Sequence, residues 1–359
     1  MKLFFDARYI ETTTQTGISR YSIELGAALA KLTEVTFLIH DTAQLEWLPK
    51  NAQWIKIHNP TSVKEPFTPF VLNRYRPDVV FSPMQTMGSF GRKYKLILTL
   101  HDLIYYRHRT PPRQFNWLVR LGWRLYHATY IPQRCALNGA DVVATVSRTS
   151  KQDILNARLT KRPVIVTTNA PQQLRSYLHE AISMSEPPTN LIYMGSFMEY
   201  KNVETLIKGL EFLPGYTLHL LSRIRPERKV QYEKMAPRKV SIIFHNGVSD
   251  ETYAQLLADH ALLVSASLDE GYGIPVADAM ALGVPAVITN MPIFHEVAGN
   301  GALYFNPTDA ADFAKQVKKA SQLEIYQDLS AKGLVQSQTF SWTTSAQTLF
   351  ETAKNLTKK

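Results

Sequence analysis

The hydrophobic and polar positions of the first half of the chain alternate between short β-rich runs and segments with helical spacing. Apolar runs typical of buried strands occupy residues 2–5, 35–39, 78–81, 95–100, 141–146 and 164–167. Between the first two runs, residues 18–32 have apolar positions with helical spacing, and Ser147 precedes another helical segment as a candidate N-cap. This alternation predicts a doubly wound parallel sheet.

The pattern stops at a polar segment that contains prolines, residues 171–189, and then starts again. Further strand candidates are residues 191–194, 217–220, 240–244, 261–264, 286–288 and 302–305, and a last helix is expected over 342–356 after Ser341. The sequence therefore predicts two Rossmann-like α/β domains, residues 1–172 and 190–339, joined by a linker over 173–189. The cleft between them is the default ligand site. Residues 340–359 are expected to pack back toward the N-terminal domain.

Composition agrees with two globular domains and limits the chemistry. The chain has 359 residues, of which 45% are apolar and 19% charged, so a disordered protein is excluded. A single cysteine, Cys135, excludes a disulfide framework or a multi-cysteine metal centre and indicates a reducing, cytoplasmic compartment. No segment reaches the ~18 apolar residues of a membrane span. Asp6 and Arg8 interrupt the N-terminal apolar run, which argues against a signal peptide.

The net charge of +10 is concentrated in the first half of the chain. Residues 1–172 contain 23 Lys and Arg against 11 Asp and Glu, whereas residues 173–359 contain 17 against 19. A basic surface suits nucleic acid, an anionic membrane or phosphorylated substrates. Nucleic acid is disfavoured, because the sequence has no zinc finger, RNP-type signature or helix-turn-helix spacing.

The densest basic stretch, from Arg92 to Arg134, also carries many aromatic residues. On a helix starting at Arg113, Trp117 would share one stripe with arginines three and seven positions further on. Arginines beside aromatic rings are what a helix on an anionic membrane surface needs, and the alternative is an ordinary solvated helix over an aromatic core. The residues of this predicted membrane or acceptor face are Arg107, Arg109, Arg113, Trp117, Arg120 and Arg124.

The strongest chemical signal is the run E-G-Y-G-I-P-V-A-D from Glu270 to Asp278. It follows a predicted strand, and Pro275 suits the first residue of a helix. Free N–H groups of such a loop and helix terminus bind sugar or phosphate oxygens. A tight turn with an acid favoured by the helix dipole would explain Asp278 alone, but not two glycines, a proline and an acid within six positions.

A nicotinamide-dependent enzyme is disfavoured by the first strand-to-helix turn. That turn contains only Gly17, so the G-x-G-x-x-G pattern is absent, and the chain has no Walker-type loop either.

Over nearly its whole length the chain resembles the retaining glycosyltransferases of family four, which have the GT-B fold. The similar segments are Gly17–Tyr21, Leu98–Asp102, Ala140–Lys151, Tyr193–Ser196 with Lys201-Asn202, Phe244–Val248, Glu270–Pro285, His295–Val297, Phe305–Pro307 and Phe340–Trp342. Each segment alone is weakly specific, but their order and spacing together are specific.

The resemblance implies roles for individual residues. Lys201 would neutralise the donor diphosphate, Glu270 would hold hydroxyls of the transferred sugar or orient the reacting phosphate, and His101 would contact the sugar or the leaving phosphate. Asp278 would accept hydrogen bonds from the ribose, and Gly17 would let the backbone approach the diphosphate. The other donor-binding residues implied are Ser196, Asn202, Arg223, Gly247, Val248, Gly271, Tyr272, Gly273 and Ile274.

The implied reaction moves a hexose from a GDP- or UDP-activated sugar to a glycan or glycolipid acceptor, with retention, in the synthesis of cell-envelope polysaccharide or glycolipid. Charge builds on the leaving diphosphate in an oxocarbenium-like transition state, and cations and helix N-termini stabilise it. No metal ion or other cofactor is expected. The enzyme is expected in the cytoplasm, peripherally attached to the inner face of the membrane.

Three departures from the family pattern keep other functions open. Asp278 stands where the family has a second glutamate, Tyr200 where an arginine often precedes the Lys-Asn pair, and Ser196 where some members have arginine. One alternative is a transferase of the same fold that acts on a protein or a soluble acceptor. Another is a non-catalytic partner subunit of a glycosyltransferase.

Overall fold

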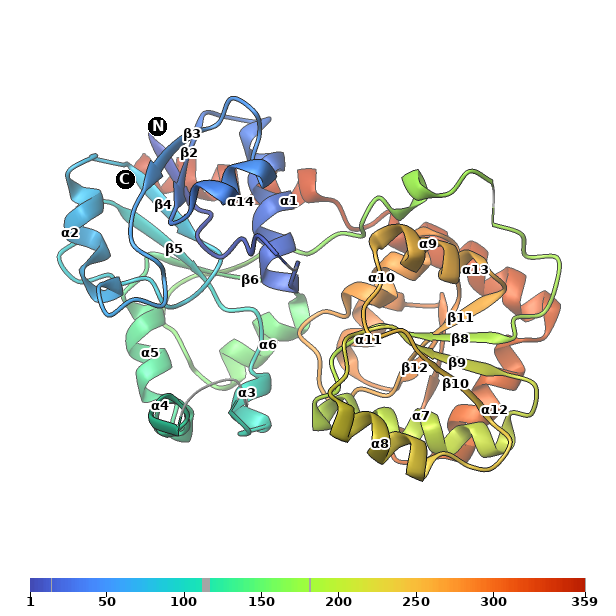
Figure 1. Cartoon of the computed structure of the whole chain (residues 1–359). Coiled ribbons are helices and arrows are strands. Elements are labelled where there is room, and N and C mark those ends of the chain that lie inside the picture. The colour runs from blue at the N-terminus through green and yellow to red at the C-terminus, as the bar shows by residue number, and fades with distance from the viewer. Residues whose placement is uncertain (14, 112–116, 181, 359) are drawn as a thin grey trace. The chain divides into compact units, whose positions relative to one another are not determined.

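The computed structural model describes residues 1–13, 15–111, 117–180 and 182–358. Its contacts divide the chain into two units, Met1–Asn169 with Ser341–Lys359 (unit 1) and Ala170–Phe340 (unit 2). The chain thus passes between the units three residues before the predicted end of the first domain. Each unit contains one parallel sheet covered by helices (Figure 1).

Unit 1 is built on a seven-stranded sheet in the order β3-β2-β1-β4-β5-β6-β7. The strands are β1 (Leu3–Asp6), β2 (Val35–Ile39), β3 (Gln53–Lys56), β4 (Val79–Ser82), β5 (Lys95–Thr99), β6 (Val142–Thr145) and β7 (Val164–Val166). The helices are α1 (Gly17–Ala30), α2 (Thr68–Asn73), α3 (Ile104–Arg107), α4 (Trp117–Ala128), α5 (Ile131–Asn138), α6 (Arg148–Asn156) and α14 (Trp342–Thr357), with 3-10 turns η1 (Thr42–Trp47) and η2 (Glu65–Phe67).

The C-terminal helix α14 completes the core of unit 1. It packs against α1 and against three strands of the sheet. The ring of Trp342 lies 5.9 Å from that of Tyr21, and Ser345 Oγ donates a hydrogen bond of 2.8 Å to the carbonyl of Thr168. The last segment of the chain is therefore a structural part of the unit that contains the first.

Sequence patterning located six of the seven strands of this sheet. Strand β3 was not expected, because it lies at the sheet edge with three of its four side chains exposed and so has no apolar run. Strands β1 and β4, in contrast, are buried along their whole length, as in a parallel sheet covered on both faces. The predicted cap of α6 is confirmed, since Ser147 Oγ accepts a hydrogen bond of 2.9 Å from the backbone N–H of Ser150.

Unit 2 has a six-stranded parallel sheet in the order β10-β9-β8-β11-β12-β13. The strands are β8 (Asn190–Tyr193), β9 (Thr217–Leu220), β10 (Ser241–Phe244), β11 (Ala261–Ser265), β12 (Ala286–Thr289) and β13 (Ala302–Phe305), all within two residues of the predicted bounds. The helices are α7 (Val203–Gly209), α8 (Pro226–Met235), α9 (Asp250–Ala258), α10 (Ile274–Ala281), α11 (Pro292–Ala298), α12 (Ala310–Ala320) and α13 (Leu323–Ser337), with 3-10 turns η3 (Leu174–Tyr177), η4 (Glu199–Lys201) and η5 (Leu210–Phe212).

Each sheet reverses its strand order beside its first strand. In unit 1 the reversal lies between β1 and β4, and in unit 2 between β8 and β11. The loops that leave two such strands diverge, and ligands of open α/β sheets bind there. These two loop pairs are the places to look for a site. In the ranges that the structure describes, no helix has both the length and the apolarity to span a bilayer.

Candidate active site

An ion pair joins the two loops at the reversal point of unit 2. Lys201 follows β8 and Glu270 follows β11, and Lys201 Nζ lies 2.5 Å from Glu270 Oε1. The two side chains are only 15% and 14% exposed, so the pair is shielded but still reachable from solvent. The structure therefore brings together two of the three predicted catalytic residues in the part of the sheet where this fold class binds ligands.

A strained residue and its anchors position Lys201. Asn202 has a left-handed backbone (φ 51°), a conformation that asparagine tolerates better than most residues, and it separates η4 from α7. Its Nδ2 donates to the carbonyl of Pro307 at 2.7 Å, and its Oδ1 accepts from Thr205 Oγ1 at 3.0 Å. Both ends of this predicted donor-binding side chain are thus used within the protein. The role that the structure supports for Asn202 is to hold the loop of Lys201.

Glu270 is oriented from the neighbouring strands. Ser267 Oγ donates to Glu270 Oε1 at 2.8 Å, and the carbonyl of Ser267 accepts from Thr289 Oγ1 at 2.7 Å. In addition, the backbone N–H of Leu268 donates to the carbonyl of Tyr200 at 2.7 Å, which ties the two loops together. Both side-chain contacts of the carboxylate fall on Oε1, so Oε2 remains available for hydroxyl groups of a sugar.

The glycine turn after Glu270 depends on the absence of a side chain at Gly273. This residue has φ +97°, and a Cβ there would lie 2.8 Å from the ring of Phe294. Helix α10 then begins at Ile274, so Pro275 is its second residue rather than the predicted first. Gly271 and Tyr272 are buried beside this turn. The compact turn places the N-terminus of an eight-residue helix directly after the carboxylate.

The carboxylate of Asp278 is buried, and both of its oxygens already accept hydrogen bonds within the protein. It is 1% exposed, its Oδ1 accepts from the backbone N–H of Gln172 at 2.8 Å, and its Oδ2 accepts from Gln172 Nε2 at 2.7 Å. A ribose hydroxyl would therefore have to compete with Gln172. Gln172 could not be identified from the sequence, because it lies 106 positions from Asp278 in a segment without a motif.

The remaining predicted donor-binding residues lie in loops after β8, β9 and β10. Ser196 is exposed, and its carbonyl accepts a hydrogen bond of 2.6 Å from the hydroxyl of Tyr193. Arg223 is also exposed and packs over Gly247, where φ is +106° and a Cβ would lie 3.1 Å from the arginine Cγ. Val248, which follows Gly247, is partly buried. The structure thus brings Arg223 and Gly247 together, at the ends of adjacent strands.

The other two predicted residues belong to unit 1. His101 follows β5, its ring meets that of Tyr21 edge-on at 5.1 Å, and its Nε2 lies 2.8 Å from the carbonyl oxygen of Pro83. Because a carbonyl only accepts, Nε2 carries the proton and Nδ1 is the ring's acceptor. Burial lowers the pKa of His101, which favours this neutral form. Gly17 is the first residue of α1, after the N-cap Thr16.

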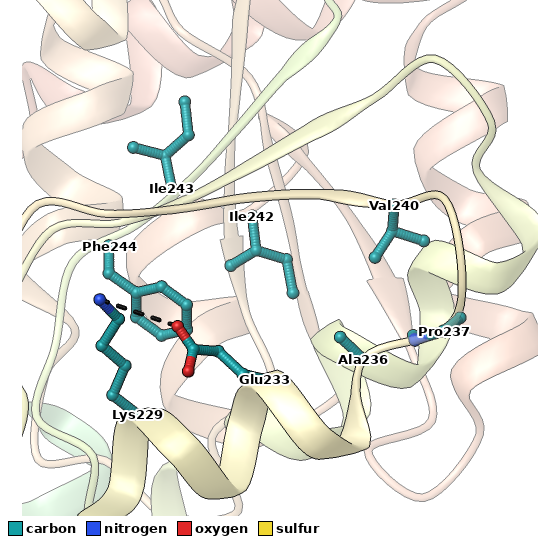
Figure 2. A pocket seen from close by; sticks show the side chains of 8 residues that line it. All are labelled: Lys229, Glu233, Ala236, Pro237, Val240, Ile242, Ile243 and Phe244. Atoms are coloured by element: carbon teal, nitrogen blue, oxygen red, sulfur yellow. Dashed lines mark ion pairs between the residues drawn. The ribbon is translucent and has the colours of Figure 1, made fainter. Parts of the chain in front are cut away.

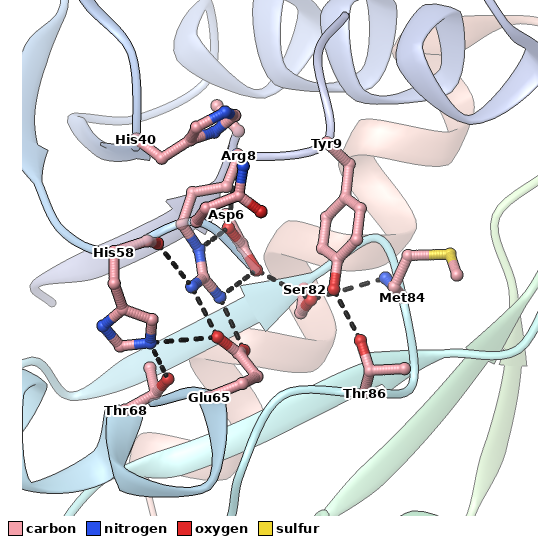
Figure 3. A network of polar contacts seen from close by, with 12 residues as sticks. Asp6, Arg8, Tyr9, His40, His58, Glu65, Thr68, Ser82, Met84 and Thr86 are labelled. Carbon is pink, nitrogen blue, oxygen red and sulfur yellow. Dashed lines mark hydrogen bonds and ion pairs between the residues drawn. The ribbon is translucent and has the colours of Figure 1, made fainter. Parts of the chain in front are cut away.

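At the reversal point of unit 1 lies a buried ionic network that sequence analysis missed (Figure 3). Arg8 donates to both carboxylate oxygens of Asp6, at 2.7 and 3.0 Å, and to both of Glu65, at 2.7 and 2.8 Å. His58 Nε2 lies 3.1 Å from Glu65 Oε2, and Ser82 Oγ donates to Asp6 at 3.0 Å. These carboxylates raise the pKa of Arg8 although its burial alone would lower it. The network has no sequence motif, because its members are up to 76 positions apart.

Helix α4, at the predicted membrane face, packs one set of aromatic residues against its neighbours and exposes three leucines and a tryptophan on the other side. Toward α3 and α5 it places Trp123, Tyr126 and His127, whose rings contact Tyr105, Tyr106 and one another. On the opposite side, Trp117, Leu118, Leu121 and Leu125 are 49–72% exposed. Successive residues are turned by about 100°, so these four share an arc of about 100°, and Arg120 and Arg124 both lie along one side of it. We call this arc the α4 apolar face.

Two further arginines of the predicted face have partners within the protein. Arg107 Nη1 lies 2.9 Å from Asp153 Oδ2, and Arg109 Nε donates to the carbonyl of Tyr106 at 3.1 Å. Arg113, the predicted start of the stripe, lies outside the described residues.

A groove of about 470 Å³ lies elsewhere in unit 2, between α8 and the edge strand β10 (Figure 2). Its residues are Lys229, Glu233, Ala236, Pro237, Val240, Ile242, Ile243 and Phe244. None of them is a predicted site residue, and its one ion pair, Lys229 with Glu233, is a surface contact of 3.7 Å. Among the residues whose positions are described, no three His, Cys, Asp or Glu side chains are grouped as metal ligands.

Comparisons with known proteins identify relatives of both units. A family model described as glycosyl transferases group 1 matches residues 176–333, within unit 2. The O-antigen chain mannosyltransferase RfbU of Salmonella typhimurium is 25% identical over 326 residues, which cover 86% of this chain and 88% of RfbU. O-antigen chain mannosyltransferase B of Escherichia coli is 26% identical over 375 residues, which cover 95% and 96%. The crystal structure of Anabaena Alr3699/HepE in complex with UDP-glucose has a TM-score of 0.71 and 17% identity, and covers 99% of this chain and 100% of that one.

Proposed function

We propose that this chain, a glycosyltransferase of family four with the GT-B fold, transfers a hexose from a nucleoside-diphosphate sugar to a growing cell-envelope glycan, with retention at the anomeric carbon. The observation that carries this proposal is the Lys201–Glu270 pair of 2.5 Å between the loops after β8 and β11. A cation and a carboxylate at this point of the sheet supply the two functions that the reaction needs, one toward the leaving diphosphate and one toward the sugar.

Lys201 acts on the leaving group in this mechanism. As the anomeric C–O bond breaks, its electron pair passes to the diphosphate oxygen, and an ammonium group at that oxygen stabilises the charge. Lys201 Nζ, which contacts Glu270 here, exchanges part of this contact for the diphosphate. The acceptor hydroxyl oxygen forms the new bond on the same face of the sugar, and its proton goes to the departing phosphate. No protein nucleophile is then required.

Glu270 binds the sugar. Its Oε1 is held by Lys201 and Ser267, which fixes the carboxylate so that Oε2 accepts from sugar hydroxyls. Groups that are held in place before the reaction cost no reorganisation in the transition state, and losing one such hydrogen-bonding group costs about 2.7–4 kcal/mol. In unit 1, His101 has a neutral imidazole whose Nδ1 can accept a hydrogen bond from a hydroxyl group.

Mannose and glucose are the first sugars to test. Two relatives are O-antigen chain mannosyltransferases, and Anabaena Alr3699/HepE was crystallised with UDP-glucose. The relatives' names support an acceptor that is an envelope polysaccharide or its lipid-linked precursor. We assign the positive charge next to the sugar diphosphate to Lys201 and to Arg223, and propose that the reaction needs no metal ion. Turnover that is unchanged by a chelator would support this, and turnover restored only by a divalent cation would contradict it.

We further propose that unit 1 binds the acceptor at a membrane surface. The α4 apolar face has Trp117 and Leu121 exposed, with Arg120 and Arg124 at its border, a combination suited to anionic headgroups and the acyl boundary beneath them. The enzyme would then work at the inner face of the cytoplasmic membrane.

Binding of the donor is tested by a thermal-shift panel of GDP-mannose, UDP-glucose and the free nucleotides. A ligand at 100 times its Kd stabilises the protein by about 2.7 kcal/mol, which shifts the melting temperature measurably. We expect one nucleotide to stabilise the wild type and the Lys229→Met control, and to stabilise Lys201→Met less. Lys229 is the matched control because its ion pair with Glu233 is an exposed one. A panel without any shift would contradict the proposal.

One observation favours a second candidate function, a non-catalytic partner subunit. The carboxylate of Asp278 is bound on both oxygens by Gln172, which leaves the proposed ribose ligand engaged. Such a subunit would have no transfer activity of its own and would bind no nucleotide sugar, so the same panel separates the two candidates.

A further inference from the structure

Unit 1 has a second exposed apolar surface that the α4 apolar face does not include. It is formed by Val63, Phe67, Phe70 and Phe90, with exposed fractions of 90%, 61%, 48% and 83%. We call it the phenylalanine patch. The same unit buries its strand phenylalanines completely. The exposure of these other rings is therefore not explained by the lack of a hydrophobic core in unit 1. Contiguous apolar surface of this kind marks an interaction site more often than isolated exposed residues do.

The residues of the patch come from two segments that pack together. Phe67 and Phe70 are three positions apart on the consecutive turns η2 and α2. The ring of Phe70 covers Gly91, where a Cβ would lie only 3.0 Å from it, which brings the loop with Phe90 alongside. The loop is fixed there, because Asn73 Nδ2 on α2 donates to the carbonyl of Gly91 at 2.9 Å. The segments of Phe70 and Phe90 are therefore held side by side, and Val63 and Phe67 precede Phe70 in the first of them.

Most of the charged residues around the patch are basic. Lys64, Arg74 and Lys93 are exposed in the same two segments. Within residues 59–78 and 83–95 there are two acids, Glu65, whose carboxylate is buried against Arg8 at 2.7 Å, and the exposed Asp78, which accepts from the backbone N–H of Lys2 at 2.6 Å. The surface therefore offers aromatic rings with an excess of exposed cations over exposed carboxylates. This is the composition that binds an anionic lipid interface, where the rings enter the acyl boundary and the cations meet the headgroups.

The patch and the α4 apolar face lie toward opposite ends of α5. At its C-terminal end, Arg92 Nε donates to the carbonyl of Gly139 at 3.2 Å, which places the loop of Phe90 there. Near its N-terminal end, the hydroxyl of Tyr126 on α4 donates to Gln133 at 3.2 Å. The segments that carry the two surfaces thus contact opposite ends of one helix of eight residues, which is about 12 Å long.

We propose that the phenylalanine patch is a second membrane contact of unit 1, which inserts into the interface of an anionic bilayer beside the α4 apolar face. This inference rests on the membrane docking proposed above and adds to it. Two contacts on one rigid unit bind more tightly than either does alone, because the second one forms at a high effective concentration. Two contacts also fix the rotation of unit 1 on the bilayer, which a single helix does not.

Sedimentation with vesicles tests the proposal without any need for activity. Vesicles of phosphatidylethanolamine and phosphatidylglycerol in a 3:1 ratio are compared with vesicles of pure phosphatidylcholine, for the wild type and Phe67→Ser, Phe90→Ser and Leu121→Ser. Phe212→Ser is the matched control, since Phe212 is 43% exposed in unit 2. Removing one inserted phenylalanine should lower the partition coefficient about tenfold. The control should leave it unchanged, and near-UV circular dichroism checks that each variant is folded.

A spin label reports insertion directly. The label is placed at Phe90→Cys in a Cys135→Ser background, because Cys135 is exposed and would react as well. We expect anionic vesicles to shield the label from a water-soluble relaxation agent. A label that stays accessible while the protein sediments with the vesicles would overturn the proposal.

The outcomes also separate this inference from the function on which it rests. If Leu121→Ser lowers binding and Phe67→Ser and Phe90→Ser do not, the α4 face binds lipid and the patch does not, which overturns the inference alone. If the patch variants change self-association in gel filtration and leave vesicle binding unchanged, the patch is a protein interface and the inference is again wrong. The thermal-shift panel with nucleotide sugars does not involve lipid. A wrong donor assignment would therefore appear in that panel and would leave vesicle sedimentation unchanged.

Discussion

Asp278 and Gln172 form a closed pair in which both carboxylate oxygens are satisfied by one residue, through its backbone N–H at 2.8 Å and its side-chain amide at 2.7 Å. A buried acid of this kind is stabilised by its partner, and a ligand that uses the same oxygens must displace it. The pair thus couples the stability of unit 2 to the proposed ribose contact.

Gln172→Ala should lower the free energy of unfolding and increase the affinity for the nucleotide. The variant keeps the backbone hydrogen bond and loses the one from Nε2, which costs about 1.5–3 kcal/mol when the acceptor is charged. Oδ2 then has one hydrogen bond fewer with which the ribose must compete, so the Kd of the nucleotide should fall up to about tenfold. Titration calorimetry and urea unfolding measure the two effects. Gln327→Ala removes an exposed amide contact to Met184 and serves as control. A higher Kd in Gln172→Ala would contradict the competition.

Lys201→Met should reduce turnover far more than it reduces stability. The substitution leaves Glu270 held only by Ser267, and it removes the cation that stabilises the leaving diphosphate. We expect kcat to fall about 100- to 1,000-fold, the range for one electrostatic group in an active site. Lys229→Met should keep wild-type turnover. If kcat of Lys201→Met stayed within a factor of three of the wild type, Lys201 would have no part in the chemistry.

Arg8→Met should destabilise unit 1 strongly. Arg8 is the cation between Asp6 and Glu65, and its removal leaves the two buried carboxylates without the guanidinium that donates to all four of their oxygens. Breaking a buried pair in this way costs about 3–5 kcal/mol. The midpoint of urea unfolding, followed by tryptophan fluorescence, measures the loss. Arg74→Met, an exposed arginine of the same unit, should change the stability by less than about 0.5 kcal/mol. Equal midpoints for the two variants would show that the network is not needed for stability.

Acid should destabilise the protein partly through His101. Burial lowers the pKa of this side chain below the ordinary value of about 6.5, and the hydrogen bond to Pro83 opposes the shift only in part. Below about pH 6.5 the unfolded chain takes up a proton that folded His101 does not, so the free energy of unfolding falls as the pH drops toward the folded pKa. Urea unfolding at pH 7.5, 6.5 and 5.5 should show a shallower slope for His101→Gln. The exposed His179→Gln is the control, and identical slopes for both variants would refute this contribution.

Most of the fold could be predicted because buried parallel strands leave continuous apolar runs. Strand β3 could not, since an exposed edge strand is polar on most of its side chains. The start of α10 was one residue off, because proline has no N–H to lose and is tolerated elsewhere in the first turn, where backbone N–H groups have no partner within the helix.

The site was predictable only where the chemistry is local in sequence. Glu270 and Gly273 belong to one short motif, and the topology of the sheet then brings Lys201 to them. The pairing of Asp278 with Gln172 and of Arg8 with Glu65 depends on tertiary contacts across 106 and 57 positions, for which a single sequence carries no signal. The phenylalanine patch was not predicted either, because apolar residues on short turns look like core residues until their exposure is known.

The most direct test of the central claim is transfer itself, measured with radiolabelled GDP-mannose and UDP-glucose and with lipid-linked glycan from envelope membranes as acceptor. We predict that the wild type incorporates one of the two hexoses into the acceptor with retained anomeric configuration, and that Glu270→Gln reduces this rate at least 100-fold while the protein stays folded. Transfer by Glu270→Gln at the wild-type rate would contradict the account, and so would an inverted linkage in the product.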